Sequence, residues 1–172
     1  MKNKVISILF AGVGGQGILK ASEICGVAAM LAGYEVKKSE IRGISQRFGS
    51  VESHLRYGKE VYSPIIPLGK ADFLVCLHKE EEQRFINYLG KKGINLTSFL
   101  DLASKNLKNP RLLNTFMLGV LSSYLELREK YWIKSIELNF PEKYVEMNLQ
   151  AFKLGRKLAL NQKKQSQFQI VV

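Results

Sequence analysis

A short apolar run ends in a cluster of glycines near the start of the chain. Residues Val5 to Ala11 form a continuous β-branched and aromatic run, which is typical of a strand buried on both faces of a parallel sheet. The segment Gly12-Val-Gly-Gly-Gln-Gly17 follows, and apolar residues then recur at helical spacing from Gln16 to Ala32 before Gly33. The pattern predicts a strand, a glycine turn and a helix, which is how many α/β folds begin.

Further strands are predicted in the first half of the chain. Their patterns are alternating or continuously apolar, and they span Tyr34–Ser39, Val51–Tyr57, Glu60–Ser63 and Ala71–Leu77. The short Gly58-Lys59 link suggests an antiparallel hairpin between the second and third of these, followed after Leu77 by a charged helix over Lys79–Leu89. We therefore expect a mixed, mostly parallel sheet.

The second half of the chain is expected to be helical. Beyond Asn95 the apolar spacing predicts helices over Thr97–Asn106, Arg111–Leu127, Lys130–Leu138 and Glu142–Leu160. The expected fold class is α/β, a three-layer α/β/α sandwich with a mixed, mostly parallel sheet and a helical C-terminal part. The 172 residues contain neither a repeat nor a linker, so we expect one domain over residues 1–162 and a loose polar tail over residues 163–172.

The glycine turn is the first candidate binding site. Its pattern is G-x-G-x-x-G, and its candidate ligand-binding residues are Gly12, Gly14, Gly15, Gln16 and Gly17. Free N–H groups and the helix dipole would face an anion there. The second strand ends in Lys37 and Lys38 without a clear acid to hold a ribose, which disfavours NAD. An alternative stays open, in which the glycines only permit close packing of strand and helix.

The segment that follows the second strand is the other candidate site. Its cofactor-binding candidates are Arg42, Ser45, Gln46 and Arg47, at the expected carboxyl end of a strand, where ligands bind in α/β sheets. Arginine makes bidentate contacts with phosphate or carboxylate. The alternative is a solvated basic loop in which Gly43 and Gly49 are turn residues.

Histidine and proline positions suggest contact surfaces rather than chemistry. His54 and Arg56 share one face of their predicted strand, and we expect surface or interface roles for both. Pro64 and Pro67 exclude a central strand, so Tyr62–Gly69 is expected to be a rigid extended loop. Its Tyr62, Ile65 and Ile66 side chains would either dock a partner or pack beneath the loop.

Charge and cysteine content exclude several classes of protein. The 26 basic against 15 acidic residues give a net charge of +11, which favours an anionic cofactor or an acidic partner subunit. We expect no nucleic-acid binding, because no reader motif is present. The apolar run from Val5 is too short to span a membrane and lacks a cleavage site, so a cytoplasmic protein is expected. Cys25 and Cys76 form no C-x-x-C pair, and no metal site or catalytic constellation is expected.

Four ordered segments resemble the gamma-type subunit of 2-oxoacid:ferredoxin oxidoreductases, and among these the indolepyruvate-type subunit. The segments are Phe10–Ile18, Ser39–Arg56, Tyr62–Pro67 and Gly69–Asp72. Residues Asn109 to Arg111, Asn114, Leu118-Gly119 and Pro141 to Arg156 are also similar, so the resemblance covers about residues 4–157.

The resemblance implies an enzyme complex that oxidatively decarboxylates a 2-oxo acid to an acyl-CoA and passes electrons to ferredoxin. In such enzymes thiamine diphosphate and the iron-sulfur clusters belong to other subunits or domains, which would be the partners of this chain. The chain alone is then expected to bind no cofactor and to be inactive, and coenzyme A would meet the basic segment in the assembled complex. A stand-alone nucleotide-binding module is the alternative.

The sequence also departs from that family. Arg42 stands where similar sequences have His, and Phe48 stands where they have Gly, which suggests a different loop shape or another substrate. After Leu89 the family continues through further strands, whereas here residues 91–95 lead almost directly into Thr97. A smaller sheet is therefore expected.

Overall fold

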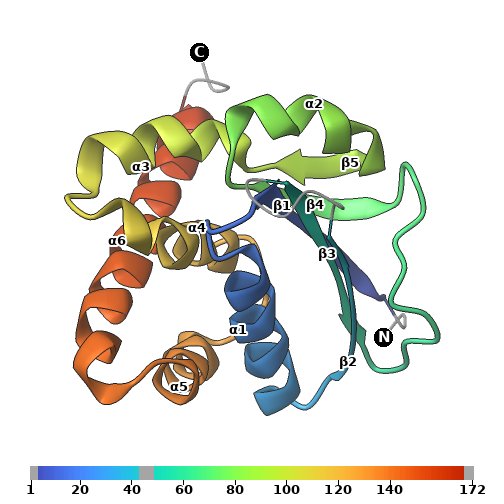
Figure 1. Ribbon diagram of the computed structural model, residues 1–172, viewed down its shortest axis with the longest axis horizontal. Coiled ribbons are helices and arrows are strands. Elements are labelled where there is room, and N and C mark those ends of the chain that lie inside the picture. The colour runs from blue at the N-terminus through green and yellow to red at the C-terminus, as the bar shows by residue number, and fades with distance from the viewer. Residues whose placement is uncertain (1–3, 43–48, 169–172) are drawn as a thin grey trace.

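The computed structural model describes residues 4–42 and 49–168 and contains one five-stranded sheet covered mainly by helices (Figure 1). The strands are β1 (Ile6–Val13), β2 (Glu35–Arg42), β3 (Ser50–Gly58), β4 (Ala71–Cys76) and β5 (Leu89–Asn95). The helices are α1 (Ile18–Leu31), α2 (Glu82–Phe85), α3 (Leu100–Asn106), α4 (Leu113–Ser122), α5 (Glu129–Asn139) and α6 (Glu142–Phe168). The order across the sheet is β2-β3-β1-β4-β5.

The strand directions place several strand ends at one edge of the sheet. β1 is parallel to β4 and antiparallel to β3, while β2 is antiparallel to β3 and β4 is parallel to β5. All strands except β3 therefore run in the same direction, which confirms the mixed, mostly parallel sheet. Because parallel strands end at a common edge, the carboxyl ends of β1, β2 and β4 lie together.

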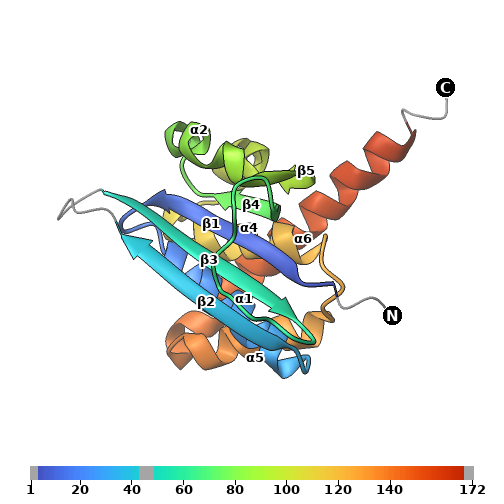
Figure 2. The same cartoon turned by 90° about the vertical axis from the view of Figure 1, so that its right-hand side faces the viewer.

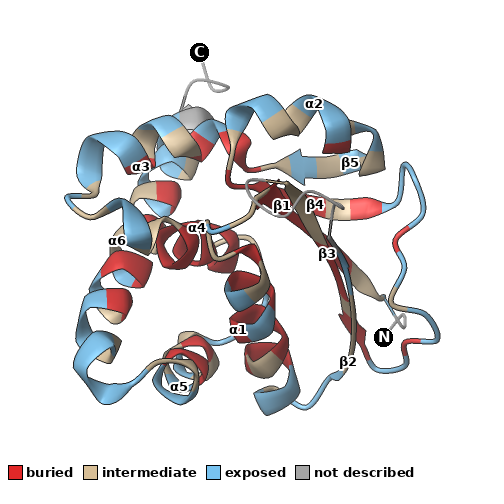
Figure 3. Ribbon diagram, in the orientation of Figure 1, coloured by how far each residue is buried: buried red, intermediate tan, exposed pale blue. Residues whose placement is uncertain are grey.

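The two faces of the sheet carry layers of unequal thickness. Helices α1, α4, α5 and α6 cover one face, where Phe10 and Leu55 of the sheet share a core with Phe116 and Phe152 (Figures 1 and 2). The buried sides of these helices face the sheet and each other (Figure 3). The opposite face is covered by the short α2 region and the extended segment 59–70, in a smaller core that includes Ile66. The predicted three-layer α/β fold is thus confirmed.

The predicted hairpin after β3 is wrong. β3 pairs with β1 and β2, and residues 59–70 adopt no strand. Side chains of β3 hold this segment instead, since Nδ1 of His54 accepts a hydrogen bond from the Ile66 N–H at 2.9 Å. Arg56 donates to the carbonyl oxygens of Ser63 and Ile65. The prolines remove N–H donors from the segment, and these side-chain contacts replace a strand ladder.

The expected surface role of His54 is also wrong. Its side chain is 1% exposed, lies edge-on to the ring of Tyr88 and fastens segment 59–70 to the sheet. The His54 side chain is therefore part of the interior of the fold. The packing interpretation of the loop holds for Ile66, which is buried, whereas Tyr62 and Ile65 are exposed. Docking of a partner through these two side chains stays a prediction.

Burial of His54 predicts that stability falls with acid. Burial lowers the pKa of this imidazole below its ordinary value of 6.5, so the unfolded chain takes up the proton first. The contribution of the neutral His54 imidazole to folding stability is present above pH 6.5. It is lost as the pH falls from there toward the pKa of His54 in the folded state. We expect the denaturation midpoint to decrease between pH 7.5 and pH 5.5, and to decrease less in His54→Gln, which keeps an acceptor for Ile66 N–H.

Glu52 supplies a matched background for that measurement. Burial raises the pKa of its carboxyl, with Arg84 opposing the rise, so its titration stabilises the folded state as pH falls. The chain with His54 and the His54→Gln variant should therefore both be measured in a Glu52→Gln background, where this opposing titration is absent. Identical pH profiles with and without His54 would contradict the prediction.

Several other elements differ from the sequence prediction. The predicted helix over Lys79–Leu89 is interrupted, with two 3-10 turns flanking the single turn of α2. Strand β5 was not predicted, and its Gly93 lies so close to β4 that an added Cβ would be 2.7 Å from the carbonyl oxygen of Ala71. Helix α4 ends at Ser122, before the predicted end, and α6 continues beyond Leu160 to Phe168. The expected tail is thus helical over residues 163–168, and residues 169–172 lie outside the described ranges.

Within residues 4–42 and 49–168, no helix combines the length and apolar character that crossing a bilayer requires.

Candidate functional site

The glycine turn connects the carboxyl end of β1 to the start of α1. Gly12, Gly15 and Gly17 have φ angles of 152°, 92° and 78°, which glycine adopts far more readily than other residues. At Gly17 an added Cβ would lie 2.5 Å from Nδ2 of Asn114, so a side chain there would also have to displace Asn114. The turn thus depends on glycine for both conformation and packing.

The side chain of Gln16 braces this turn from within. Its Oε1 accepts a hydrogen bond from the Val13 N–H at 3.0 Å, and its Nε2 donates to the carbonyl oxygen of Leu77 at 3.0 Å. One amide therefore ties the turn to itself and to the end of β4. The Val13 N–H already has an acceptor, which supports the packing interpretation for this part of the loop. Gly15 is exposed, and an added Cβ there would meet nothing within 4 Å, so the turn is open on that side.

A buried polar ladder supports the turn from below. Asn114, at the start of α4, donates from Nδ2 to the carbonyl oxygen of Gly17 at 3.4 Å. The neighbouring Thr115 hydroxyl donates to Oδ1 of Asn148 in α6 at 2.7 Å, and all three polar side chains are buried. Sequence reasoning noted Asn114 only within the family resemblance and assigned it no role. The ladder links the turn to two helices distant in sequence.

The candidate arginine segment begins and ends beside the glycine turn. Arg42 and Gly12 both lie opposite Val51, on either side of β3, so their backbones are separated by about 10 Å, two strand spacings. Gly14 donates its N–H to the carbonyl oxygen of Gly49 at 3.0 Å. The predicted Ser45, Gln46 and Arg47, like Phe48, lie outside the described residues, as does the side chain of Arg42. The structure thus brings together both ends of the segment and the turn.

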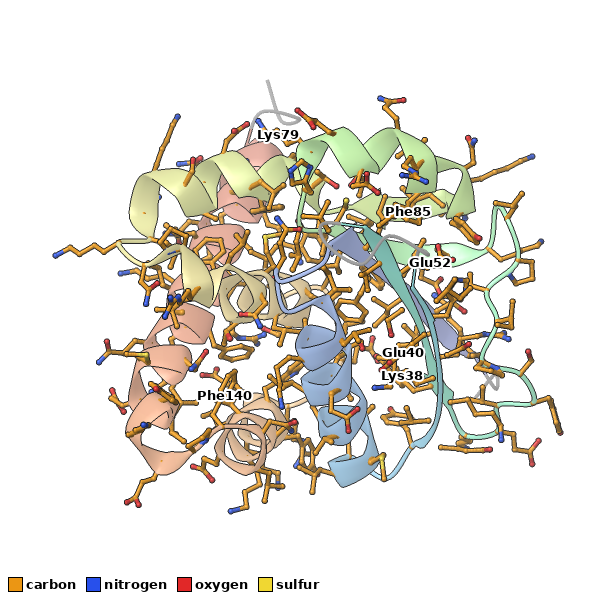
Figure 4. The ribbon with its side chains drawn as sticks, viewed as in Figure 1. Lys38, Glu40, Glu52, Lys79, Phe85 and Phe140 are labelled. Carbon is orange, nitrogen blue, oxygen red and sulfur yellow. The ribbon has the colours of Figure 1, made fainter. Side chains whose placement is uncertain are left out.

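Lys38 in β2 is engaged in the fold. Its ammonium group contacts the carboxylates of Glu23 and Glu40, and Figure 4 shows Lys38 and Glu40 together between α1 and the sheet. Burial lowers the pKa of Lys38, but the hydrogen bonds to these two carboxylates outweigh that effect and raise it. The charge of Lys38 is therefore compensated locally and contributes little to attracting an anion.

One polar residue near the turn was not predicted as part of the site. His78 directly follows Leu77, whose carbonyl oxygen binds Gln16, and its Nδ1 is buried without a hydrogen-bond partner within residues 4–42 and 49–168. Its position immediately after a predicted buried strand is the signal that could have identified it.

The two cysteines do not fit an iron-sulfur cluster. Cys25 belongs to the core beneath the helices, whereas Cys76 belongs to the smaller core on the opposite face of the sheet. Burial raises the pKa of both thiols, that of Cys76 to about 11, so thiolate ligands are disfavoured. Across the described ranges, no group of three or more His, Cys, Asp or Glu side chains could hold a metal ion.

Comparison with known proteins assigns the chain to a family. The family described as pyruvate ferredoxin/flavodoxin oxidoreductase matches residues 7–100 and 97–158. The chain belongs to this family. Indolepyruvate oxidoreductase subunit IorB of Thermococcus kodakarensis is 33% identical over 195 residues, covering 91% of this chain and 96% of the relative. The 2-oxoglutarate synthase subunit KorC of Methanocaldococcus jannaschii is 27% identical, covering 88% and 92%.

Two solved structures share the fold of this chain. The gamma subunit of a keto/oxoacid ferredoxin oxidoreductase from Geobacter sulfurreducens superposes with a TM-score of 0.76 at 23% identity, covering 91% of this chain and 99% of that one. A 2-oxoglutarate:ferredoxin oxidoreductase from Magnetococcus marinus, with 2-oxoglutarate, coenzyme A and succinyl-CoA bound, gives a TM-score of 0.80 at 20% identity. It covers 93% of this chain, which spans 32% of the longer one.

The alignments also bear on the region after β5. The two stretches matched by the family overlap only at residues 97–100, which follow β5 and include the first residue of α3. The alignment with the Thermococcus subunit spans 195 positions against the 172 residues of this chain, so the relative contains residues that this chain lacks. A sheet smaller than that of the family remains a prediction.

Proposed function

We propose that this chain is a non-catalytic small subunit of an indolepyruvate-type 2-oxoacid:ferredoxin oxidoreductase. The assembled enzyme would oxidatively decarboxylate an aryl pyruvate to an acyl-CoA and pass electrons to ferredoxin. The observation that carries the proposal is the likeness to indolepyruvate oxidoreductase subunit IorB, because it extends over 96% of that relative. A match of nearly full length relates this chain to a whole subunit rather than to a shared motif.

The partners in this proposal are the subunits that bind thiamine diphosphate and iron-sulfur clusters, with ferredoxin as acceptor of the complex. When bound there, thiamine diphosphate supplies carbanion stabilisation and the clusters carry electrons. The buried cysteines of this chain do not fit a cluster of its own. The net charge of +11 is suited to an acidic partner surface.

The contribution of the chain itself would lie at the carboxyl edge of the sheet. There the turn braced by Gln16 and the arginine segment would form a rim that receives the phosphates of coenzyme A. Helix α1 begins at this rim, and its dipole favours negative charge. A stand-alone nucleotide-binding module is less well supported, because Gln16 occupies the N–H of Val13 within the turn.

Reconstitution tests the proposed function. We expect the purified chain alone to give no ferredoxin reduction with indolepyruvate and coenzyme A, and the chain mixed anaerobically with its large partner subunit to give full turnover. The partner alone should be about a hundredfold slower, because a poorly positioned active site loses about that factor. The measurement is the initial rate of ferredoxin reduction at matched cluster content.

Two results would contradict the proposal. One is turnover or a redox centre in the isolated chain, which would give it chemistry of its own. The other is a partner subunit that is equally active with and without the chain. Affinity capture of the native complex would identify the partner used.

A further inference from the structure

A pocket of about 410 Å³ opens at the end of the sheet opposite the glycine turn. It is formed by the beginnings of β1 and β4, the end of β3, part of β5 and residues 124–127 between α4 and α5. The volume lies within the range of small-molecule sites. The proposed function does not use this pocket.

Aromatic rings form much of the pocket wall. Tyr34 and Tyr57 lie with ring centroids 5.3 Å apart, and Phe73 and Tyr124 lie 6.2 Å apart in an edge-to-face arrangement. Rings in such pairs present faces and edges that attract a further aromatic ring. The interior is therefore suited to a flat apolar group.

Tyr57 supplies a polar group within this apolar wall. The residue lines the pocket and is only 4% exposed. No hydrogen bond of this hydroxyl is found within the described ranges. Burial raises the pKa of Tyr57, which keeps the hydroxyl protonated and able to donate.

Charged groups at the pocket favour an anion. Of its carboxylates, that of Asp72 accepts a hydrogen bond from the Ser7 N–H at 2.9 Å and pairs with Lys4 at 3.6 Å, so it is already compensated. Lys59 and Lys92 line the pocket as well, and neither has an ion pair with another described residue. Against them stands the exposed carboxylate of Glu126, which leaves an excess of positive charge.

We propose that this pocket binds a small aromatic carboxylate. The ring of the ligand would lie against the aromatic side chains of the pocket wall. Its carboxylate would accept a hydrogen bond from the Tyr57 hydroxyl near the ammonium groups of Lys59 and Lys92. A ring alone would leave the buried hydroxyl without a partner, and a simple anion would leave the aromatic wall uncovered. A ligand that carries both groups satisfies both halves of the site.

Calorimetric titration of the full chain with phenylacetate tests this proposal. Phenylacetamide keeps the ring without the charge, and acetate keeps the charge without the ring. We expect phenylacetate to bind at least tenfold more tightly than either. Tyr57→Phe should weaken its binding about tenfold, since a hydrogen bond to a charged group is worth that factor or more.

A second variant tests the lysines independently of the buried tyrosine. The double substitution Lys59→Ala and Lys92→Ala changes side chains at the mouth of the pocket, so folding is expected to be unaffected, and it should also weaken phenylacetate binding. Lys91→Ala is the matched control, because Lys91 precedes Lys92 in β5 and does not line the pocket. Phenylacetate binding no tighter than phenylacetamide, or unchanged in the lysine double variant, would overturn the proposal.

Discussion

Replacing Gly119 with alanine is expected to lower the free energy of unfolding by about 3 kcal/mol. Gly119 in α4 and Gly155 in α6 lie where the two helices meet. An added Cβ would be 2.0 Å from the carbonyl oxygen of Phe152 at the first position and 2.1 Å from that of Phe116 at the second. Both obstacles are backbone atoms, so the helices must separate and loosen the core between them. The better helix propensity of alanine, about 1 kcal/mol, offsets only part of this cost.

Gly26→Ala is the matched control for that measurement. Gly26 is also a buried helical glycine, but its added Cβ would meet Cδ1 of Leu55 at 3.3 Å, the mobile end of a side chain. We expect its free energy of unfolding to change by less than about 1 kcal/mol. Urea denaturation followed by circular dichroism compares the two variants. Equal effects would show that the α4–α6 contact is no closer than an ordinary helix contact.

Removing both arginines of the candidate segment is expected to raise the KM for coenzyme A about a hundredfold in the assembled enzyme. Each lost hydrogen bond between charged groups costs about 1.5–3 kcal/mol, and 1.4 kcal/mol is a factor of ten. The variant is Arg42→Ala with Arg47→Ala, and kcat at saturating coenzyme A should change little, because the loss is one of binding. The structural reason is that the segment begins in the same row of the sheet as Gly12.

Lys37→Ala controls for the general loss of positive charge. Lys37 lies on β2 toward the opposite end from Arg42 and pairs with Glu35 at 3.2 Å. Its removal should leave the KM for coenzyme A unchanged at constant ionic strength. An unchanged KM in the double arginine variant would exclude the segment from coenzyme A binding, even if the chain proves to be the proposed subunit.

Local sequence patterns predicted the elements that depend on residues close together in the chain. The strand, glycine turn and helix at the start of the chain follow from residue order alone, and the alternation in β3 correctly divides its two faces. Leu55 and Tyr57 face the helical core, whereas His54 and Arg56 face segment 59–70. Periodicity reports which residues share a face, because side chains on a strand alternate.

The elements and contacts that the sequence did not predict depend on residues far apart in the chain. Strand β5 has little β-propensity and forms where its glycines allow close approach to Ala71 of β4. Gln16 bridges to Leu77, and Asn114 reaches Gly17, across long stretches of chain. The aromatic pocket likewise gathers residues from four strands and from several connecting segments. None of these pairings has a short-range signature.

The separation of Cys25 and Cys76 by the thickness of the sheet has a practical consequence. Neither thiol can reach the other, and both have raised pKa values, so aerobic oxidation is slow and cannot close an internal disulfide. We therefore expect that the chain can be purified and stored in air. Under the proposed function, oxygen must be excluded only when a cluster-bearing partner is added.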